Sequence, residues 1–332
     1  MVHLIRAVEA HVGGQPLRLI VEGAPRVPGR TMAQKRDSMR RQGDQLRRAV
    51  VLEPRGHMDM CAALLTEPVS PGAHAGLLFM DADGFAAMSG HGVIGAATIA
   101  LERGLIVTDG ETLTFDTVAG TVHVRARLQE QGERRRVDSV AFTNVPSFVT
   151  SPGQVVRIGT REVRVDVAFG GLFYAIVDTE AIGIPLDAAR LPELRRLGAE
   201  IRHAVDAAGI EHPTDRALSG AAGVIFTGPA HDPEAHLRNV TVFGSGTVDR
   251  SPCGTGTSAV MAVLDAMGLL PEHEVFVHES LIGTLFRGRI LRRTQVGEFP
   301  AIVPQIEGTA WLTGEHTFYV DDDDPLHDGF RL

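Results

Sequence analysis

The chain has 332 residues, of which 44% are hydrophobic, and this is enough for about two globular domains with ordinary cores. Its formal net charge of −9 argues against a general nucleic-acid binder or a protein of anionic membrane surfaces, because both classes carry a basic surplus. The N-terminal stretch MVHLIRAVEAHVGG lacks the apolar core of a signal peptide, and no apolar run approaches the roughly 18 residues of a membrane span. We therefore expect a cytoplasmic protein.

Short runs rich in Val, Ile and Leu, bounded by Gly, Pro or Asp, predict β-strands along most of the chain. In chain order the predicted strands are HLIRAV (3–8), RLIVEG (18–23), AVVLEP (49–54), GLLFMD (76–81), TLTFDT (112–117), TVHVRAR (121–127), VDSVAFTNV (137–145), VRVDVAF (163–169), FYAIVD (173–178), GVIFTG (223–228), NVTVFG (239–244), PAIVPQIEG (300–308) and TFYVDDDD (317–324). Apolar residues at three- and four-residue steps predict helices at about 31–48, 91–104, 186–208 and 254–267. Many strands follow one another without a helix between them, so the pattern favours an α+β fold over regular βαβ alternation.

Two distant stretches resemble each other, MSGHGVIGAATIALERGLI at 88–106 and PCGTGTSAVMAVLDAMGLL at 252–270. A constant offset of 164 residues (253 − 89) pairs Ser89 with Cys253, and each of the two follows a strand and a polar turn and precedes a helix. Because the offset is close to half the chain, we expect two related halves. The first spans residues 1–150 and carries Ser89, the second spans 151–314 and carries Cys253, and the C-terminal segment 315–332 returns to the first half.

Ser89 and Cys253 are thus predicted to lie at helix N-termini, where unpaired backbone N–H groups and the helix dipole favour negative charge. Such a position is expected to lower the pKa of the Cys253 thiol below its usual value of about 8.5. The glycines that follow would let a carboxylate or phosphate approach the backbone closely. The alternative is that both residues are simple N-caps of core helices. With only two cysteines in the chain, a functional cysteine must act as a lone thiol.

Two proton carriers, one in each half, suit the inversion of an amino-acid centre. One group removes the Cα proton and the other delivers a proton to the opposite face. Since the Cα–H bond is a weak acid, stabilisation of the carboxylate as it gains enediolate character matters more than the base alone.

These motifs also resemble a known family. MSGHG and DRSPCGTGTSA are similar to blocks of the proline racemase superfamily, and most similar to those of its hydroxyproline 2-epimerase branch; EPRGHMDM (53–60) and HESLIGTLFRGR (278–289) extend the resemblance over nearly the whole chain. The resemblance implies the diaminopimelate-epimerase-like fold, with two pseudo-symmetric α/β halves, each a curled sheet around a central helix, and the substrate between them. It also implies chemistry without pyridoxal phosphate or another cofactor, a small-molecule substrate such as hydroxyproline or proline, and a homodimer.

The resemblance further implies roles for single residues. Ser89 and Cys253 become the catalytic acid/base pair, and Asp249 becomes the partner of the ring ammonium with the help of His91. The residues implied to bind the carboxylate or to lie beside it are Gly90, His91, Gly254 and Thr255. Further candidates for substrate contact are Gly92, His236 and Phe173, with Phe169 and Tyr174 as other aromatic residues that could wall the ring.

The chain departs from the family at Ser89, where the racemases and many epimerases have a second cysteine. A serine hydroxyl is a far poorer base than a thiol, so the two directions of proton transfer should be unequal unless a neighbour activates it. This leaves open a trans-3-hydroxy-L-proline dehydratase, which needs only one base, although those relatives usually have Thr in place of Cys253. Another amino-acid racemase and a catalytically inactive protein that binds proline analogues are further alternatives.

Four other features are interpreted without a catalytic role. His231 and His236 are expected to make loop hydrogen bonds and no metal site, and the acidic run 321–324 is expected to be a solvated turn. Cys61 is expected to be a small buried residue, and HVGGQPLR (11–18) is expected to turn between two strands.

Overall fold

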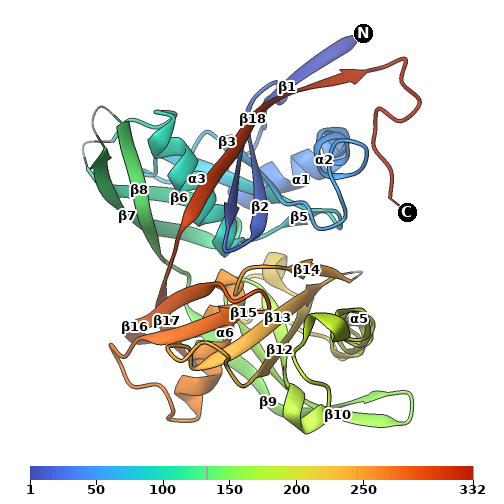
Figure 1. Cartoon of the computed structure of the whole chain (residues 1–332), viewed down its shortest axis with the longest axis vertical. Coiled ribbons are helices and arrows are strands. Elements are labelled where there is room, and N and C mark those ends of the chain that lie inside the picture. The colour runs from blue at the N-terminus through green and yellow to red at the C-terminus, as the bar shows by residue number, and fades with distance from the viewer. Residues whose placement is uncertain (109, 132–133, 245, 332) are drawn as a thin grey trace. The chain divides into compact units, whose positions relative to one another are not determined.

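The computed structural model describes residues 1–108, 110–131, 134–244 and 246–331. The chain separates into two compact units, each made of strands around a central helix (Figure 1). Unit 1 comprises Met1–Phe142 and Thr309–Leu332, and unit 2 comprises Thr143–Gly308. The boundaries expected from the sequence were residues 150 and 314, and the chain changes unit several residues earlier at both places.

Unit 1 is a mixed sheet with one buried helix. Its elements are β1 (Val2–Val12), β2 (Gln15–Glu22), α1 (Met32–Gln42), α2 (Asp44–Val51), β3 (Ala62–Thr66), β4 (Ala75–Met80), β5 (Phe85–Ala86), α3 (Gly90–Glu102), β6 (Thr112–Thr117), β7 (Gly120–Gln131), β8 (Arg134–Thr143) and β18 (Ala310–Asp321). The strands pair in the order β18–β1–β2–β3–β4–β6–β7, with β2/β3 and β4/β6 parallel and the other pairs antiparallel. The helix α3 packs against β1, β2, β3, β7 and β18.

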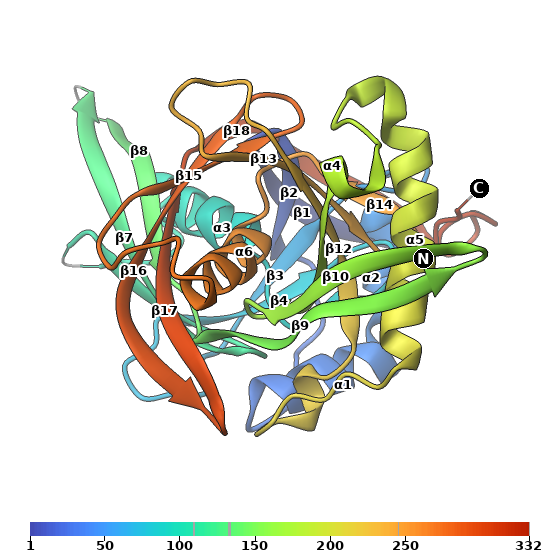
Figure 2. The same ribbon diagram turned by 90° about the horizontal axis from the view of Figure 1, so that it is seen from below.

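Unit 2 is a ring of strands around α6. Its elements are β9 (Ser147–Ile158), β10 (Arg161–Phe169), β11 (Phe173–Asp178), α4 (Thr179–Ile182), η1 (Ala188–Arg190), α5 (Leu191–Ala207), η2 (Arg216–Leu218), β12 (Ala221–Gly228), β13 (Leu237–Phe243), β14 (Thr247–Asp249), α6 (Gly254–Ala266), β15 (Phe276–Ser280), β16 (Leu285–Val296) and β17 (Phe299–Gly308). The pairings run β9–β10–β11–β12–β13–β15–β16–β17 and return from β17 to β9. Figure 2 shows α6 among these strands, while α5 covers the outer side of β12.

Both units repeat one order of elements. An antiparallel pair (β1/β2 or β10/β11) is followed by helices and by a strand parallel to the second member (β3 or β12). The next strand (β4 or β13) pairs antiparallel with the one before it, and a short strand (β5 or β14) and the central helix follow. The strand after the helix (β6 or β15) then pairs in parallel with β4 or β13. After each central helix, a leucine N–H bonds back to the carbonyl oxygen five residues earlier, Leu105 to Ala100 and Leu269 to Leu264. The duplication inferred at the offset of 164 residues is therefore present in three dimensions.

Two local predictions were wrong. The predicted strand AVVLEP is the end of α2, because Ala49, Val50 and Val51 form the buried face of a helix. The predicted helix 31–48 is two helices, which meet at Gly43. A short apolar run fits a buried helix as well as a strand, so the sequence pattern alone could not separate the two. The strands β3, β5, β9, β14, β15 and β16 and the short helices α4 and η2 were not predicted as elements.

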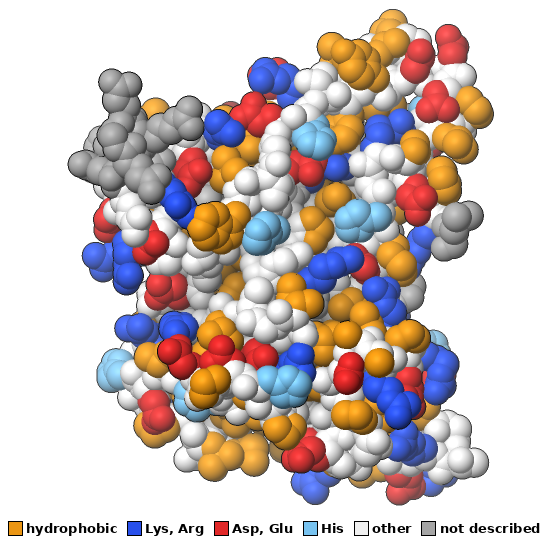
Figure 3. All heavy atoms as spheres, in the orientation of Figure 1, with side chains coloured by type: hydrophobic (Ala, Val, Ile, Leu, Met, Phe, Trp, Pro, Cys, Tyr) orange, Lys and Arg blue, Asp and Glu red, His pale blue; other side chains and the backbone are white. Residues whose placement is uncertain are grey.

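Charged side chains of both signs lie on the surface. On the face drawn in Figure 3, acidic and basic side chains are interspersed. Within the described residues, no helix is both long enough and apolar enough to cross a membrane.

Candidate active site

In unit 1, Ser89 caps the central helix α3. Its backbone is extended (φ −148°), and its Oγ accepts a hydrogen bond of 3.2 Å from the N–H of Gly92. The same Oγ lies 3.3 Å from Nδ1 of His91, which is 6% exposed. A Cβ added at Gly92 would lie 2.8 Å from Ser89 Oγ, so any residue larger than glycine would clash with this hydroxyl in its present position. The structure thus brings three sequence-predicted residues together and gives Ser89 an imidazole that can take up its proton.

In unit 2, Cys253 caps α6 in the same way. Its Sγ accepts a hydrogen bond of 3.4 Å from the N–H of Gly256, and the residue is 2% exposed. A Cβ at Gly256 would lie 3.0 Å from Sγ, which is the counterpart of the contact between Gly92 and Ser89. Gly254 and Thr255 form the first turn of α6, as Gly90 and His91 form that of α3. Both central helices therefore begin with a proton-bearing side chain that accepts a backbone N–H of the helix's own first turn.

The electrostatic environment of Cys253 differs from the prediction. Burial first, and then the negative charge of Asp249, raise the pKa of the thiol to about 12, against weaker opposing effects from the Gly256 N–H and the hydroxyls of Thr255 and Thr241. The expectation of a lowered pKa was wrong, because a sequence shows the helix N-terminus but not how completely the strands bury it. The thiol is thus mainly protonated at neutral pH and would be a strong base once ionised.

Tyr174 lies beside the thiol, whereas the sequence predicted it only as one of several aromatic residues that could wall the ring. It is fully buried in β11, and its hydroxyl lies 2.7 Å from Thr255 Oγ1 and 3.8 Å from Cys253 Sγ. Burial, and next the neighbouring Cys253, raise the pKa of Tyr174 well above its ordinary value, so the phenol stays protonated. The signal in the sequence was the period of two in a strand, which turns Tyr174 and Phe173 to opposite faces.

Asp249 lies at the end of β14 and is 2% exposed. Its Oδ1 accepts hydrogen bonds from the N–H of Ser251 at 2.8 Å and from its hydroxyl at 2.7 Å. The Ser251 Oγ in turn accepts the N–H of Cys253 at 3.1 Å. The carboxylate predicted to hold a ring ammonium is therefore built into the turn that carries the thiol.

Two further candidates lie elsewhere in unit 2. Phe173 is buried in an aromatic cluster with Phe148, Phe169 and His212, with ring centroids 4.9 Å from Phe169 and 6.0 Å from Phe148. His236 is exposed, and its Nδ1 accepts the backbone N–H of Val277 at 3.0 Å. Both have a structural explanation that needs no substrate.

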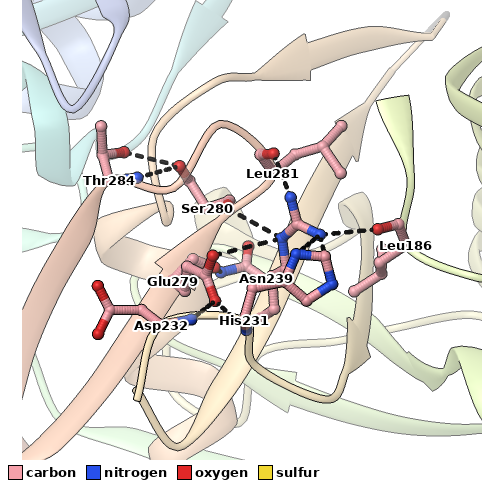
Figure 4. Close-up of polar contacts among 9 residues, drawn as sticks. Leu186, His231, Asp232, Asn239, Glu279, Ser280, Leu281 and Thr284 are labelled. Carbon is pink, nitrogen blue, oxygen red and sulfur yellow. Dashed lines mark hydrogen bonds and ion pairs between the residues drawn. The ribbon is translucent and has the colours of Figure 1, made fainter. Parts of the chain in front are cut away.

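The HDPEAH segment, which contains His231, is fastened by a buried ion pair (Figure 4). Arg238 and Glu279 are 8% and 3% exposed, and their Nε and Oε1 atoms are 3.6 Å apart. Glu279 Oε2 accepts the backbone N–H groups of His231 at 2.6 Å and Asp232 at 3.1 Å, and Arg238 Nη1 contacts the His231 ring. The described residues hold no group of three or more His, Cys, Asp or Glu side chains placed to bind a metal.

The remaining interpreted features lie in unit 1. Gly13 and Gly14 form the predicted turn between β1 and β2, with φ of 57° and 92°. Cys61 is half-buried, less than expected, and its Sγ accepts a hydrogen bond of 3.3 Å from Gln15 Nε2. The run Asp321–Asp324 is a turn beside the chain's N-terminus, with the terminal ammonium 3.3 Å from an oxygen of Asp322.

Comparison with known proteins decides the family. The family model described as proline racemase matches residues 7–331. The chain belongs to the proline racemase family. It is 41% identical over 328 residues to a trans-3-hydroxy-L-proline dehydratase of Bacillus cereus, covering 98% of this chain and 97% of that protein. It is also 40% identical over 333 residues to a 4-hydroxyproline 2-epimerase of Streptosporangium roseum, covering 99% and 98%.

Solved structures confirm the fold of this proline racemase family member. A hydroxyproline epimerase from Agrobacterium vitis, with bound trans-4-hydroxy-L-proline, is 32% identical with a TM-score of 0.92 and covers 99% of this chain and 95% of that one. A PhzF-family protein of Bacillus anthracis shares the fold alone, with 12% identity, a TM-score of 0.58 and coverage of 95% and 99%. The two-halved α/β fold and the family membership inferred from the sequence are thus confirmed, and the chain stands among racemases and epimerases, with a dehydratase also among its relatives.

Proposed function

We propose that this chain is a cofactor-independent 4-hydroxyproline 2-epimerase of the proline racemase type. The observation that carries the proposal is the equivalence of Ser89 and Cys253, each of which caps a central helix with a proton-bearing side chain. Cys253 is the decisive member, because the dehydratases that the sequence resembles usually have threonine at this position.

In the proposed reaction Cys253 and Ser89 exchange protons with opposite faces of one substrate. The Cα–H bond breaks as the Cys253 thiolate takes the proton, and the resulting carbanion takes the Ser89 hydroxyl proton on the other face. His91 Nδ1, 3.3 Å from Ser89 Oγ, can relay that proton and so offsets the weakness of serine as a base in the reverse direction. The first turns of α3 and α6 supply the N–H groups that stabilise the substrate carboxylate as it becomes an enediolate.

The raised pKa of Cys253 suggests how the thiol is activated. The negative charge of Asp249 is one of the causes that hold the thiol protonated. A ring ammonium bound to Asp249 would compensate that charge and favour the thiolate. Ionisation of Cys253 is then coupled to the arrival of a substrate that carries a positive nitrogen, and the empty enzyme keeps a protected thiol.

A dehydratase is the second candidate, and the relative in Bacillus cereus favours it. Dehydration requires one base to remove the Cα proton while the 3-hydroxyl leaves, so a weakly basic Ser89 would not limit it. An inactive protein that binds proline analogues is the third candidate, and Ser89 in place of a second cysteine is its only support.

Proton NMR in D₂O separates the three candidates. L-proline, trans-4-hydroxy-L-proline and trans-3-hydroxy-L-proline are incubated separately with the enzyme. Deuterium at Cα with inversion supports the epimerase, whereas loss of the 3-hydroxyl with formation of a pyrroline would identify the dehydratase. A ligand-dependent melting shift without any exchange would identify the binding protein.

Variants of the two capping residues complete the experiment. Cys253→Ala should abolish Cα exchange, whereas Cys61→Ala, at the other cysteine, should keep it. Ser89→Ala should impair inversion more than exchange of one epimer, and equal loss of both would contradict the proposed role of Ser89. Ser89→Cys should raise the rate of inversion if two bases act on one substrate.

A further inference from the structure

The two capping residues have different backbones. Ser89 is extended, with φ −148° and ψ 113°, whereas Cys253 has φ 62° and ψ 106°. A residue other than glycine at positive φ is strained, and it persists only where its surroundings hold it. Unit 2 must therefore contain a restraint on Cys253 that unit 1 does not apply to Ser89.

Thr257 supplies a contact of this kind. Its Oγ1 donates a hydrogen bond of 3.1 Å to the carbonyl oxygen of Pro252, the residue before Cys253. The orientation of that carbonyl fixes the peptide plane from which φ of Cys253 is measured. At the same offset of 164 residues (257 − 93), unit 1 has Val93, whose side chain cannot donate a hydrogen bond.

His278 determines the direction of the Thr257 hydroxyl. This histidine of β15 is fully buried, and its Nδ1 lies 2.9 Å from Thr257 Oγ1. The hydroxyl has one proton, and Pro252 O accepts it, so Nδ1 must carry a hydrogen and donate to Oγ1. Nε2 is then unprotonated and has no hydrogen-bond partner among the described residues, which costs less than a buried N–H without an acceptor. Burial lowers the pKa of His278 to about 3, so the imidazole is neutral at working pH.

The strand that carries His278 is fixed from its other face. Because side chains alternate along a strand, Glu279 points away from His278, toward the cluster in Figure 4. There it accepts two backbone N–H groups and pairs with Arg238, which also donates to the carbonyl of Leu281 at 2.5 Å. Three buried polar residues, His278, Glu279 and Ser280, thus end β15, and His278 contacts α6 through Thr257.

We propose that His278 and Thr257 are positioning residues for Cys253. The relay from His278 Nδ1–H to Thr257 Oγ1–H to Pro252 O holds the peptide before Cys253, and this keeps the thiol on the N–H of Gly256 at the start of α6. The proposal builds on the proposed catalytic role of Cys253, but its test reads the thiol directly.

The test measures the rate at which iodoacetamide modifies Cys253 at pH 9, with peptide mass mapping to separate it from Cys61. Thr257→Val introduces the residue type that unit 1 has at the equivalent position, Val93, with little change in volume. His278→Leu removes the Nδ1–H donor. Both should slow alkylation at least fivefold, because Sγ loses the N–H that favours its thiolate.

Thr257→Ser and His278→Asn keep the hydroxyl and the N–H donor, and both should stay within twofold of the wild type. Thr98→Val, at a buried threonine in α3 whose Oγ1 bonds Ile94 O, is the matched control and should leave the rate unchanged.

The direction of the effect separates positioning from general loosening. A variant that merely loosens unit 2 would expose the buried thiol and speed its alkylation. Alkylation of Thr257→Val and His278→Leu at or above the wild-type rate would overturn the proposal, as would a Thr257→Ser that behaves like Thr257→Val. In turnover, the two disruptive variants should lower kcat for Cα exchange with KM within threefold. If the wild type exchanges no substrate, the proposed function fails while the alkylation series still decides the relay.

Discussion

The hydroxyl of Tyr174 lies 2.7 Å from Thr255 Oγ1, and Thr255 Oγ1 lies 3.7 Å from the sulfur of Cys253. The phenol therefore fixes the orientation of the threonine hydroxyl that contacts the thiol. Tyr174→Phe removes this hydrogen bond, which typically contributes about 1 kcal/mol, so kcat for Cα exchange should fall by about fivefold while KM changes little. Exchange kinetics in D₂O measure both constants.

The chain provides its own control for this substitution. Tyr319 is the other of two tyrosines, and it is 68% exposed in β18. Tyr319→Phe should leave kcat and KM at their wild-type values. A Tyr174→Phe enzyme with wild-type kcat would show that Thr255 does not depend on the phenol.

The close approach of Gly92 to Ser89 leads to a second prediction. A Cβ at this position would lie 2.6 Å from Cε1 of Phe79 and 2.8 Å from Ser89 Oγ. Gly92→Ala should therefore displace the serine hydroxyl and destabilise unit 1 by about 1–3 kcal/mol, although alanine favours a helix more than glycine does. Trp311 is the single tryptophan and lies in β18, so its fluorescence during urea denaturation reports on unit 1.

Gly110→Ala is the matched control, because a Cβ there would meet no heavy atom of the described residues within 4 Å. It should change neither stability nor inversion. Gly92→Ala with wild-type stability and inversion would mean that α3 can move away from Phe79 without loss.

Much of this site could be predicted from the sequence because the motif that forms it occurs twice, once in each half. The glycines and polar turns before residues 89 and 253 predict two helix starts, and the structure begins α3 at Gly90 and α6 at Gly254. The period of two in FYAIVD predicts that Phe173 and Tyr174 face opposite sides of a strand. It does not show which side meets α6, and for this reason Phe173 and Tyr174 were both candidates, although Tyr174 is the one beside the thiol.

Tertiary burial explains the rest of what the sequence could not show. The pKa of Cys253 depends on how fully the strand ring excludes water, and this outweighs the helix N-terminus that the sequence does reveal. His278 lies 21 residues from Thr257 along the chain, and the pairing of β15 with β13 and β16 brings it to α6. The helical Val50 and Val51 were mistaken for a strand because their apolar run is too short to show a helical period.

The buried ion pair in Figure 4 leads to a third prediction. Arg238→Met should destabilise unit 2 by about 3–5 kcal/mol, because Glu279 would keep a buried charge without its cation. Urea denaturation followed by circular dichroism measures the loss. The matched control is Arg287→Met, since Arg287 and its partner Glu234 are 43% and 66% exposed although their atoms are only 2.6 Å apart. That substitution should cost no more than about 1 kcal/mol, and equal costs for both variants would mean that burial does not distinguish the two pairs.

The turn before β5 leads to a prediction about pH. Burial, and next the neighbouring charge of Asp83, raise the pKa of Asp81 to about 6, against hydrogen bonds from the backbone N–H groups of Asp83 and Gly84. A carboxyl whose pKa is higher in the folded state than in the unfolded state favours folding at low pH, and this contribution is lost as the pH rises through the folded value. The shift corresponds to about 3 kcal/mol, which partial exposure of the residue reduces to about 1–2 kcal/mol.

Asp81→Asn tests this assignment, because the amide oxygen can accept the same two N–H groups without titrating. Relative to the wild type, the variant should gain about 1–2 kcal/mol of unfolding free energy between pH 4 and pH 7 and no more above that range. Trp311 fluorescence during urea denaturation at a series of pH values measures the difference in unit 1. Asp83→Asn should move the rise to lower pH, because the charge of Asp83 is one of the two causes of the raised pKa. Parallel stability curves for Asp81→Asn and the wild type would show that Asp81 ionises normally in the fold. The turn that leads to Ser89 would then make no pH-dependent contribution to the unfolding free energy of unit 1.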